Sequence, residues 1–178
     1  MVRTVVLRVV ALALLLLLAL FGAIAVRTMQ RLPDTTVYFV RDLGTGFTLE
    51  AAHVKLGRLQ PAERARRQVE ALVAGPNSGD GSGREGLTTT FPPSTRLLSA
   101  RLVDGVLEVD LSREFGQGGG TALMAGRLNQ LFYTLTQPAD VDAVSLRIEG
   151  EEVRVFSGEG LEVDQPWLRG RHEALPLW

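Results

Sequence analysis

Cysteine is absent from the chain, and its absence excludes several kinds of chemistry. Disulfide bonds, a thiol nucleophile, a zinc–thiolate site and the acylated cysteine of a bacterial lipoprotein are all ruled out. Lysine occurs once, as Lys55, and histidine only twice. At 178 residues the chain is long enough to bury a core without disulfides, so it is compatible with a reducing or an oxidising compartment.

Positive charge is scarce outside the N-terminal segment. The formal net charge is −1, but residues 1–34 hold four arginines and one aspartate, whereas residues 35–178 hold 15 basic and 19 acidic residues. A nucleic-acid-binding domain needs a basic surface that displaces counterions from phosphates. The charge distribution therefore argues against DNA or RNA as a partner.

The longest hydrophobic run is VVALALLLLLALFGAIAV, residues 9–26, which contains neither a charged residue nor a proline. As a helix it would be about 27 Å long, close to the thickness of the hydrocarbon layer of a bilayer. Arg3 and Arg8 precede it, which is the arrangement expected when residues 1–8 stay in the cytoplasm. We therefore predict a transmembrane signal anchor over residues 9–26.

Two alternatives remain open for this segment. Ala23-Ile24-Ala25 resembles a signal-peptidase site, so the run can instead be a signal peptide that is removed. The other alternative is a buried helix of a soluble protein. The anchor and the signal peptide both place residues 35–178 outside the cytoplasm, behind a short polar tether at residues 27–34.

Residues 35–166 carry the patterns of one small domain, followed by a C-terminal tail at residues 167–178. Apolar residues alternate in the expected strands and recur every three or four residues in the expected helices. Strands or extended pieces are expected at 35–40 and 47–56, helices at 60–76 and 121–137, and hairpins at 96–111 and 143–156. The fold class is thus α/β (α+β), a small sheet with both helices packed on one face.

The periodicity also predicts which side chains face the interior. In the first helix these are Ala65, Val69, Leu72 and Val73; in the second they are Met124, Leu128, Leu131 and Leu135, widened by Leu123 and Phe132. In the first hairpin, turning at Asp104-Gly105, they are Leu98, Ala100, Leu102, Leu107, Val109 and Leu111. In the second, turning at Gly150, they are Val144, Leu146, Ile148, Val153 and Val155.

Four glycines crowd residues 116–120 before the second helix, which raises the question of a phosphate-binding loop. A P-loop would need a lysine followed by Ser or Thr after the glycines, and no lysine lies nearby. A dinucleotide-binding loop would start directly after a strand, whereas here SREF intervenes and the strands read as hairpins. We interpret the glycines as a sharp turn into the helix, with Thr121 near its cap, and keep a small bound anion as an alternative.

Residues with catalytic potential are few and dispersed. His53 and His172 lie far apart in the sequence, and Ser94 and Ser112 have no base beside them. Glu108 and Asp110 share the polar face of one expected strand, and paired carboxylates can perform acid–base catalysis. Trp167 and Trp178, the only tryptophans, either pack on the domain or mark a partner contact. The sequence thus predicts no catalytic, metal-binding or cofactor-binding residues.

Several segments together resemble the GerMN domain of the sporulation and spore-germination protein GerM and of related bacterial envelope proteins. They are VYFV, ALVAGP, GLTTTFPPSTRLLSARLVDGVLEVDLSREF, GGGTALMAGRLNQLFYTLTQ and VRVFSGEGLEVDQP. The resemblance covers residues 35–166 in a single copy. It implies a fold similar to the ring-building motifs of secretion systems, an extracytoplasmic domain tethered to the membrane, and no established enzymatic activity.

Two functional hypotheses follow. The first is a non-enzymatic binding or assembly module of the cell envelope, without cofactor, nucleotide or nucleic acid, that is held at the membrane by its N-terminal helix. Its partners would be other envelope proteins or peptidoglycan. The second hypothesis is an envelope enzyme that processes carbohydrate or hydrolyses its substrate with Glu108 and Asp110.

Overall fold

The computed structural model describes Leu14, Leu17 and residues 35–44, 46–78, 85–156 and 160–170. Residues 34–178 form one compact unit and residues 1–33 another. The predicted anchor at 9–26 lies outside the described residues, except for Leu14 and Leu17, which are helical. In the ranges given above, no helix combines the length and the apolar character that crossing a bilayer requires.

The first sheet of the larger unit begins with a hairpin formed by the two extended pieces expected at 35–40 and 47–56. Strand β1 (Thr35–Asp42) pairs antiparallel with β2 (Phe47–Val54) along its whole length. A two-residue strand that the sequence did not reveal, β3 (Leu87–Thr88), pairs with the other edge of β1 at Val40 and Arg41. The strand order is β2-β1-β3.

The remaining long strands form a second sheet, so the predicted single sheet is wrong. Its order is β10-β6-β5-β4, from Trp167–Leu168, Ala143–Ile148, Val106–Leu111 and Leu97–Val103, and β7 (Glu151–Glu152) also pairs with β6. β4 and β5 form the predicted hairpin, but β5 and β6 are parallel. Parallel neighbours require a crossover, and the short helix η2 (Arg113–Gly116) and the helix α3 (Thr121–Leu135) supply it.

Two predicted interior positions are also wrong, because the strands are interrupted there. A register shift between Leu97 and Ser99 turns Leu97 inward and leaves Leu98 43% exposed. The second hairpin ends at β7, after which β8 (Val155–Phe156) leaves the sheet to pair with β9 (Leu161–Glu162). Val155 is consequently exposed, whereas Phe156 is buried.

The helix α2 (Pro61–Ala74) has the boundaries that its sequence signals. Pro61 occupies the first turn, where its missing N–H costs no hydrogen bond, and Gly75 ends the helix with a positive φ of 81°. Ala65, Val69 and Leu72 are buried, as the periodicity predicts. A second short helix, η1 (Pro76–Ser78), follows.

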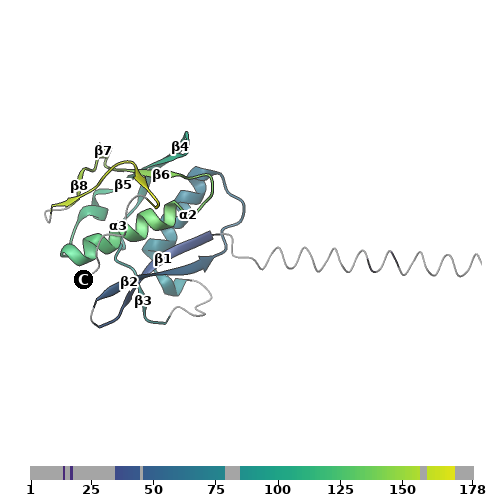
Figure 1. Ribbon diagram of the computed structural model, residues 1–178, viewed down its shortest axis with the longest axis horizontal. Helices are drawn as coiled ribbons and strands as arrows, with labels where there is room; N and C mark the ends of the chain where they lie inside the picture. Colours follow the sequence, from purple (N-terminus) through teal and green to yellow (C-terminus); the bar gives the residue numbers. More distant parts are fainter. Residues whose placement is uncertain are drawn as a thin grey trace, which may run out of the picture. The chain divides into compact units, whose positions relative to one another are not determined.

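Both helices lie between the two sheets rather than on one face of a single sheet (Figure 1). The core includes Leu128, Leu131 and Leu135 of α3 together with Leu107 of β5 and Leu146 of β6. Trp167 of β10 is buried and stacks on Phe132 of α3 with ring centroids 5.1 Å apart. Leu123, which the periodicity placed inward, is 45% exposed at the start of the helix.

The polar side of α3 is buried as well, because it completes the open edge of β1. Beyond the short pairing with β3, the N–H of Tyr38 donates to Thr134 Oγ1 (2.9 Å), and Gln130 Nε2 donates to the carbonyl of Tyr38 (3.0 Å). Gln130 Oε1 accepts from the N–H and the hydroxyl of Thr90. Gly126 permits this close approach, since a Cβ there would lie 3.2 Å from Thr90 Cγ2.

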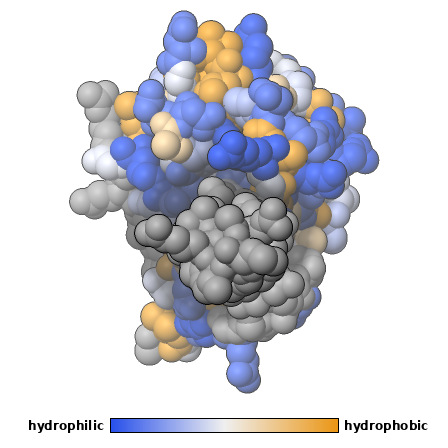
Figure 2. Space-filling model, turned by 90° about the vertical axis from the view of Figure 1, so that its right-hand side faces the viewer, coloured by the Kyte–Doolittle hydropathy of each residue, from blue (hydrophilic) through white to orange (hydrophobic). Residues whose placement is uncertain are grey.

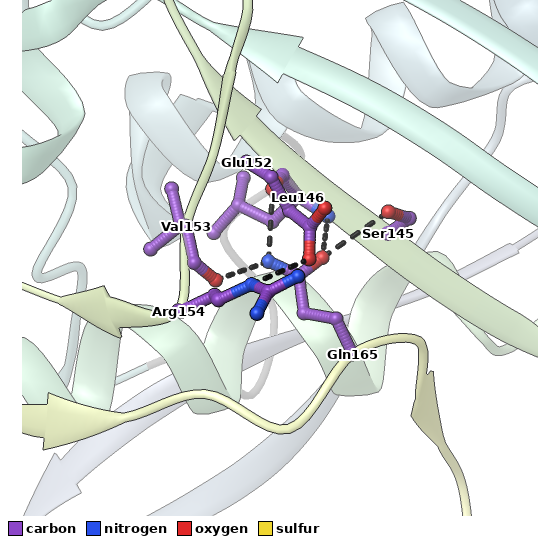
Figure 3. A network of polar contacts seen from close by, with 6 residues as sticks. All are labelled: Ser145, Leu146, Glu152, Val153, Arg154 and Gln165. Atoms are coloured by element: carbon purple, nitrogen blue, oxygen red, sulfur yellow. Dashed lines mark hydrogen bonds and ion pairs between the residues drawn. The ribbon is translucent and has the colours of Figure 1, made fainter.

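A glutamine side chain closes a gap in the second sheet in the same way (Figure 3). β10 pairs with β6 at residues 143–144 and β7 pairs with it at 147–148, which leaves Leu146 between them. Gln165 Oε1 accepts from the N–H of Leu146 (2.6 Å), while Gln165 Nε2 donates to the carbonyls of Leu146 and Val153. The amide thus replaces the missing strand residue.

The burial of α3 leads to a prediction about stability. Leu128→Ala or Leu131→Ala should each lower the free energy of unfolding by about 2–5 kcal/mol, because both side chains are fully buried and the cavity would not refill completely. Leu123→Ala is the matched control on the exposed start of the same helix and should change stability by less than about 0.5 kcal/mol. Urea unfolding measures all three. Equal effects at Leu123 and Leu128 would contradict the orientation of α3.

Candidate functional site

The two strand carboxylates do not form a catalytic pair. Glu108 Oε2 accepts from Arg101 Nη2 at 2.9 Å on the neighbouring strand, and Asp110 Oδ1 accepts from the N–H of Gly150 at 3.0 Å. The hydrogen bond to Arg101 is the main cause that lowers the pKa of Glu108. A general acid at neutral pH needs a raised pKa. Both carboxylates therefore serve structural contacts on the polar face of β5.

The structure does not assemble the other sequence-derived candidates into a site either. Ser112 is buried at the end of β5, where its hydroxyl accepts from the N–H of Arg96, and Ser94 is exposed. His53 is an exposed residue of β2, with Nδ1 3.3 Å from Thr36 Oγ1. His172 and Trp178 lie outside the described residues. Within the described ranges, no group of three His, Asp or Glu residues is arranged to hold a metal ion.

The glycine-rich loop surrounds a cation that belongs to the chain itself. Arg127, in the second turn of α3, is only 4% exposed. Its Nη1 donates to the carbonyls of Phe115 (2.6 Å) and Gln117 (3.0 Å), and its Nη2 donates to the carbonyl of Gly118 (3.1 Å). Its Nε donates to the carbonyl of Thr90 at 2.9 Å. The loop thus directs carbonyl oxygens inward, where a phosphate-binding loop would present N–H groups.

The conformation of the loop explains why glycines are needed there. Gly118 and Gly119 have positive φ values of 68° and 101°, which residues with a Cβ rarely adopt. Gly120 takes the cap position of α3, and its carbonyl accepts from the N–H of Met124. Thr121 is the first helical residue rather than the cap, and no side chain caps this end. The interpretation of the glycines as a turn into the helix agrees with this geometry.

The guanidinium of Arg127 donates to main-chain oxygens, which balance its charge. Burial lowers the pKa of Arg127 from 12.5 to about 10, so the guanidinium still carries its charge at neutral pH. It also lies 6.0 Å from the centroid of the Phe115 ring. The buried cation connects η2, the glycine loop and the segment after β3, which makes it a structural centre rather than a ligand site.

A cleft of about 400 Å³ opens between the C-terminal half of α2 and the start of β4. Its walls are formed by Arg66, Val69 and Val73 of α2 and by Thr95, Arg96 and Leu97. Val69, Thr95 and Leu97 are buried, with at most 8% of their surface exposed, and so form its floor. In the described part of the chain, Thr95 Oγ1 has no hydrogen-bond partner.

The main chain holds this floor in place. The N–H of Thr95 donates to the carbonyl of Pro92 (3.0 Å), which closes a tight turn before β4. Arg96 exchanges hydrogen bonds with Ser112, from its N–H to Ser112 Oγ (3.0 Å) and from the N–H of Ser112 to its carbonyl (2.9 Å). The cleft is therefore anchored to the sheet on one side and to α2 on the other.

The charges on α2 are unevenly paired, and this determines the polarity of the cleft. Arg67 lies 3.1 Å from Glu63 and 3.2 Å from Glu70, so it engages both acids. Arg66 lies 3.9 Å from Glu63, which is a weak pairing. Alternating charges such as these are typical of a solvated helix face, and this describes Arg67. No sequence pattern indicated that Arg66 would lie beside Thr95.

A second cleft of about 490 Å³ borders β8 and β9. Its lining is polar and includes Glu152, Arg154, Glu162, Asp164 and Gln165. Arg154 pairs with Glu152 at 3.3 Å, and Gln165 completes the edge of β6 beside it (Figure 3). These contacts stabilise the C-terminal strands. Trp167 and Leu168, expected at the start of a tail, belong to β10 and so to the sheet.

Removing the buried guanidinium should destabilise the domain. Arg127→Met leaves the carbonyls of the glycine loop and of Thr90 without their donor, so the free energy of unfolding should fall by about 2–4 kcal/mol. Arg101→Met, which breaks only an exposed ion pair with Glu108, is the control and should cost at most about 1 kcal/mol. Urea unfolding compares the two. An unchanged midpoint for Arg127→Met would show that the loop holds its conformation without the cation.

Comparison with solved structures identifies similar folds. The first GerMN domain of the sporulation protein GerM from Bacillus subtilis has a TM-score of 0.60 and 22% identity, over 76% of this chain and 98% of that one. The tandem GerMN domains of the same protein have a TM-score of 0.57 and 22% identity, over 76% of this chain and 45% of that one. A putative lipoprotein from Clostridium perfringens has a TM-score of 0.51 and 18% identity, over 75% of this chain and 85% of that one. At these identities the likeness concerns the fold.

Comparison with curated proteins finds no match. A family model does match, however, over residues 36–154, which is more than half of the chain. It is the model of the Germane domain, described as sporulation and spore germination. The matched range contains all but the first residue of the β1–β2 hairpin, the whole β4–β5 hairpin, both helices α2 and α3, and the loop around Arg127. The chain therefore belongs to the Germane family, and its larger unit is a GerMN-like domain.

Proposed function

We propose that this protein is a membrane-tethered, extracytoplasmic GerMN-domain protein of the cell envelope that works by binding other envelope proteins. Membership of the Germane family over residues 36–154 is the observation that carries the proposal. The residues with catalytic potential add support, because Glu108 and Asp110 are engaged in structural contacts on one sheet face. The proposal is accordingly a non-enzymatic one.

The surface supports binding through limited contacts rather than through one broad apolar interface. Hydrophilic residues dominate the face in Figure 2, where hydrophobic residues form separate patches. Large exposed hydrophobic side chains are likewise spread over several elements: Leu43, Leu98, Val103, Leu123 and Val155. Leu98 and Val103 lie on β4, which is the terminal strand of its sheet. An open strand edge with apolar side chains is a common docking surface for partner proteins.

A tether would make such limited contacts effective. Holding the domain at a membrane concentrates it near other membrane proteins, so a weak interface gains avidity. The hydrophobic run at residues 9–26 is the segment proposed to supply the tether. Peptidoglycan is the alternative partner within the same envelope role.

The tether is tested by fractionation of cells that produce the full-length protein. The protein should remain in the membrane pellet after washing with high salt and enter the supernatant only with detergent, because hydrophobic insertion is insensitive to ionic strength. Replacing Leu16 and Leu18 by Arg should release it, since charged residues at the centre of the bilayer are strongly unfavourable. N-terminal sequencing that finds a mature chain beginning at Val26 would contradict the anchor and establish cleavage.

Partner binding is tested by cross-linking followed by mild extraction and native gel electrophoresis. The full-length protein should migrate in a complex larger than itself, and Leu98→Glu should reduce that complex, because it places a charge on the open edge of β4. Leu43→Glu is the control, a leucine in the β1–β2 turn that is also exposed, and should leave the complex unchanged. A full-length protein that migrates alone after cross-linking would refute the assembly role.

A further inference from the structure

The chain enters and leaves the folded domain at the same place, the C-terminal turn of α3. At the start of β1, Thr35 Oγ1 accepts from Gln68 Nε2 (3.4 Å), and the same nitrogen donates to the carbonyl of Thr134 (2.9 Å). Directly after β10, Arg169 Nε donates to Thr136 Oγ1 (2.9 Å). The segments before residue 35 and after residue 170 therefore extend from the same end of the domain.

The exit after β10 is held in place by contacts with two other elements. The guanidinium of Arg169 lies 5.5 Å from the ring centroid of Tyr38 on β1 and 4.9 Å from that of Tyr133 on α3, and its Nη2 donates to the carbonyl of Tyr133. Trp167, two residues earlier, is buried against Phe132. Residues beyond 170 thus start from a fixed position next to the first strand of the domain.

The segment that continues from this exit is RHEALPLW, residues 171–178, which lies outside the described residues. Its first three residues are polar, whereas its last five, ALPLW, are apolar and end in Trp178. Tryptophan is enriched where the hydrocarbon of a membrane meets water, because its ring is apolar and its N–H needs a polar partner. The binding role proposed above makes no use of this apolar segment.

The length of the segment matches the length of the tether. Residues 27–34 and residues 171–178 are both eight residues long. Eight residues span at most about 27 Å when fully extended. A segment as long as the tether, which leaves the domain at the same end, can reach the membrane in which residues 9–26 are proposed to be anchored.

We propose that residues 174–178 insert into the interfacial layer of that membrane and form a second attachment of the domain. Leu175, Leu177 and Trp178 enter the boundary between headgroups and acyl chains, while Arg171 stays among the headgroup phosphates. The inference rests on the proposed tether. The insertion is weak by itself, but the tether makes it intramolecular, so a high effective concentration compensates for the low affinity.

A second attachment would restrict how the domain rotates on its tether. Both attachments act at the C-terminal turn of α3, so this end of the helix is held towards the bilayer. The other end of α3, with the glycine loop and the exposed Leu123, is then directed away from the membrane. The domain would present a defined face to partner proteins, and fewer orientations would have to be lost on binding.

Tryptophan fluorescence measures the insertion, because Trp167 and Trp178 are the only tryptophans of the chain. Trp167 is 5% exposed, so a quencher in the lipid should act on Trp178 alone. The full-length protein is reconstituted into phosphatidylcholine vesicles with or without bromine on the first half of the acyl chains. The brominated lipid should quench about half of the Trp178 emission, since the interface is the preferred depth of tryptophan. Trp178→Phe, which reports Trp167 alone, should not be quenched.

Three results would overturn the proposal. Equal quenching of the wild type and of Trp178→Phe would show that Trp178 does not contact lipid. Quenching that is lost in high salt would show an ionic contact instead of an apolar one. A blue-shifted but unquenched Trp178 emission would show that the segment packs on a protein surface.

Variants of the segment separate its apolar part from its polar part. Replacing Leu175 and Leu177 by Ser together should lower the quenching of Trp178 by about twofold or more, because less apolar surface enters the membrane. Glu173→Gln is the matched control in the polar part and should quench at least as strongly as the wild type. The melting temperature should be the same for all three proteins. Equal quenching in the double variant and in Glu173→Gln would contradict the insertion.

The tether and the second attachment fail separately in this experiment. Flotation of the vesicles shows whether the protein is inserted at all. A protein that does not float with the vesicles would refute the tether, and the inference with it. A protein that floats while Trp178 stays unquenched would leave the tether standing and remove only the second attachment.

Discussion

A helix whose middle turns are buried on every side must satisfy its polar side chains within the protein, and this constraint organises the domain. The two sheets enclose α3, so Arg127, Gln130 and Thr134 are removed from water although they lie beside the apolar stripe and not on it. Each bonds main-chain groups: Arg127 the glycine loop, and Gln130 and Thr134 the open edge of β1 at Tyr38. The hydrogen bonds of one helix thereby connect both sheets and complete strands that are too short to pair.

The features that resemble an active site follow from the same constraint. Left-handed glycines before a helix are typical of phosphate-binding loops, but here they turn the carbonyls of residues 117 and 118 towards Arg127. The side-chain amide of Gln165 likewise occupies a gap between β7 and β10. These polar groups have structural partners.

Central polar groups that are already hydrogen-bonded within the protein suit the binding role proposed above for this member of the Germane family. The centre is a rigid support whose polar groups are engaged, and the terminal strand β4 offers both an apolar edge and, at its start, a cationic cleft. Recognition surfaces on such folds lie on strand edges and loops, where the sequence is free to vary without disturbing the core. The function proposed for the chain accordingly depends on what the outer surface of β4 and α2 contacts.

The sequence by itself determined the helices, the turns at Asp104-Gly105 and Gly150, and most of the interior, because these follow from local periodicity and turn residues. Pro61 and Gly75, for example, bound α2, and Asp104-Gly105 joins β4 to β5. Its motifs also indicated the family. Only the tertiary structure decided that β5 and β6 are parallel, that Leu98 is displaced by a bulge, and that Arg127 and Gln130 are buried. Partner strands, and the side chains that replace them, are chosen by contacts between distant segments, which no local pattern records. The cleft at Thr95 is of this second kind, since its two walls are about 25 residues apart in the chain and meet only when α2 packs on β4.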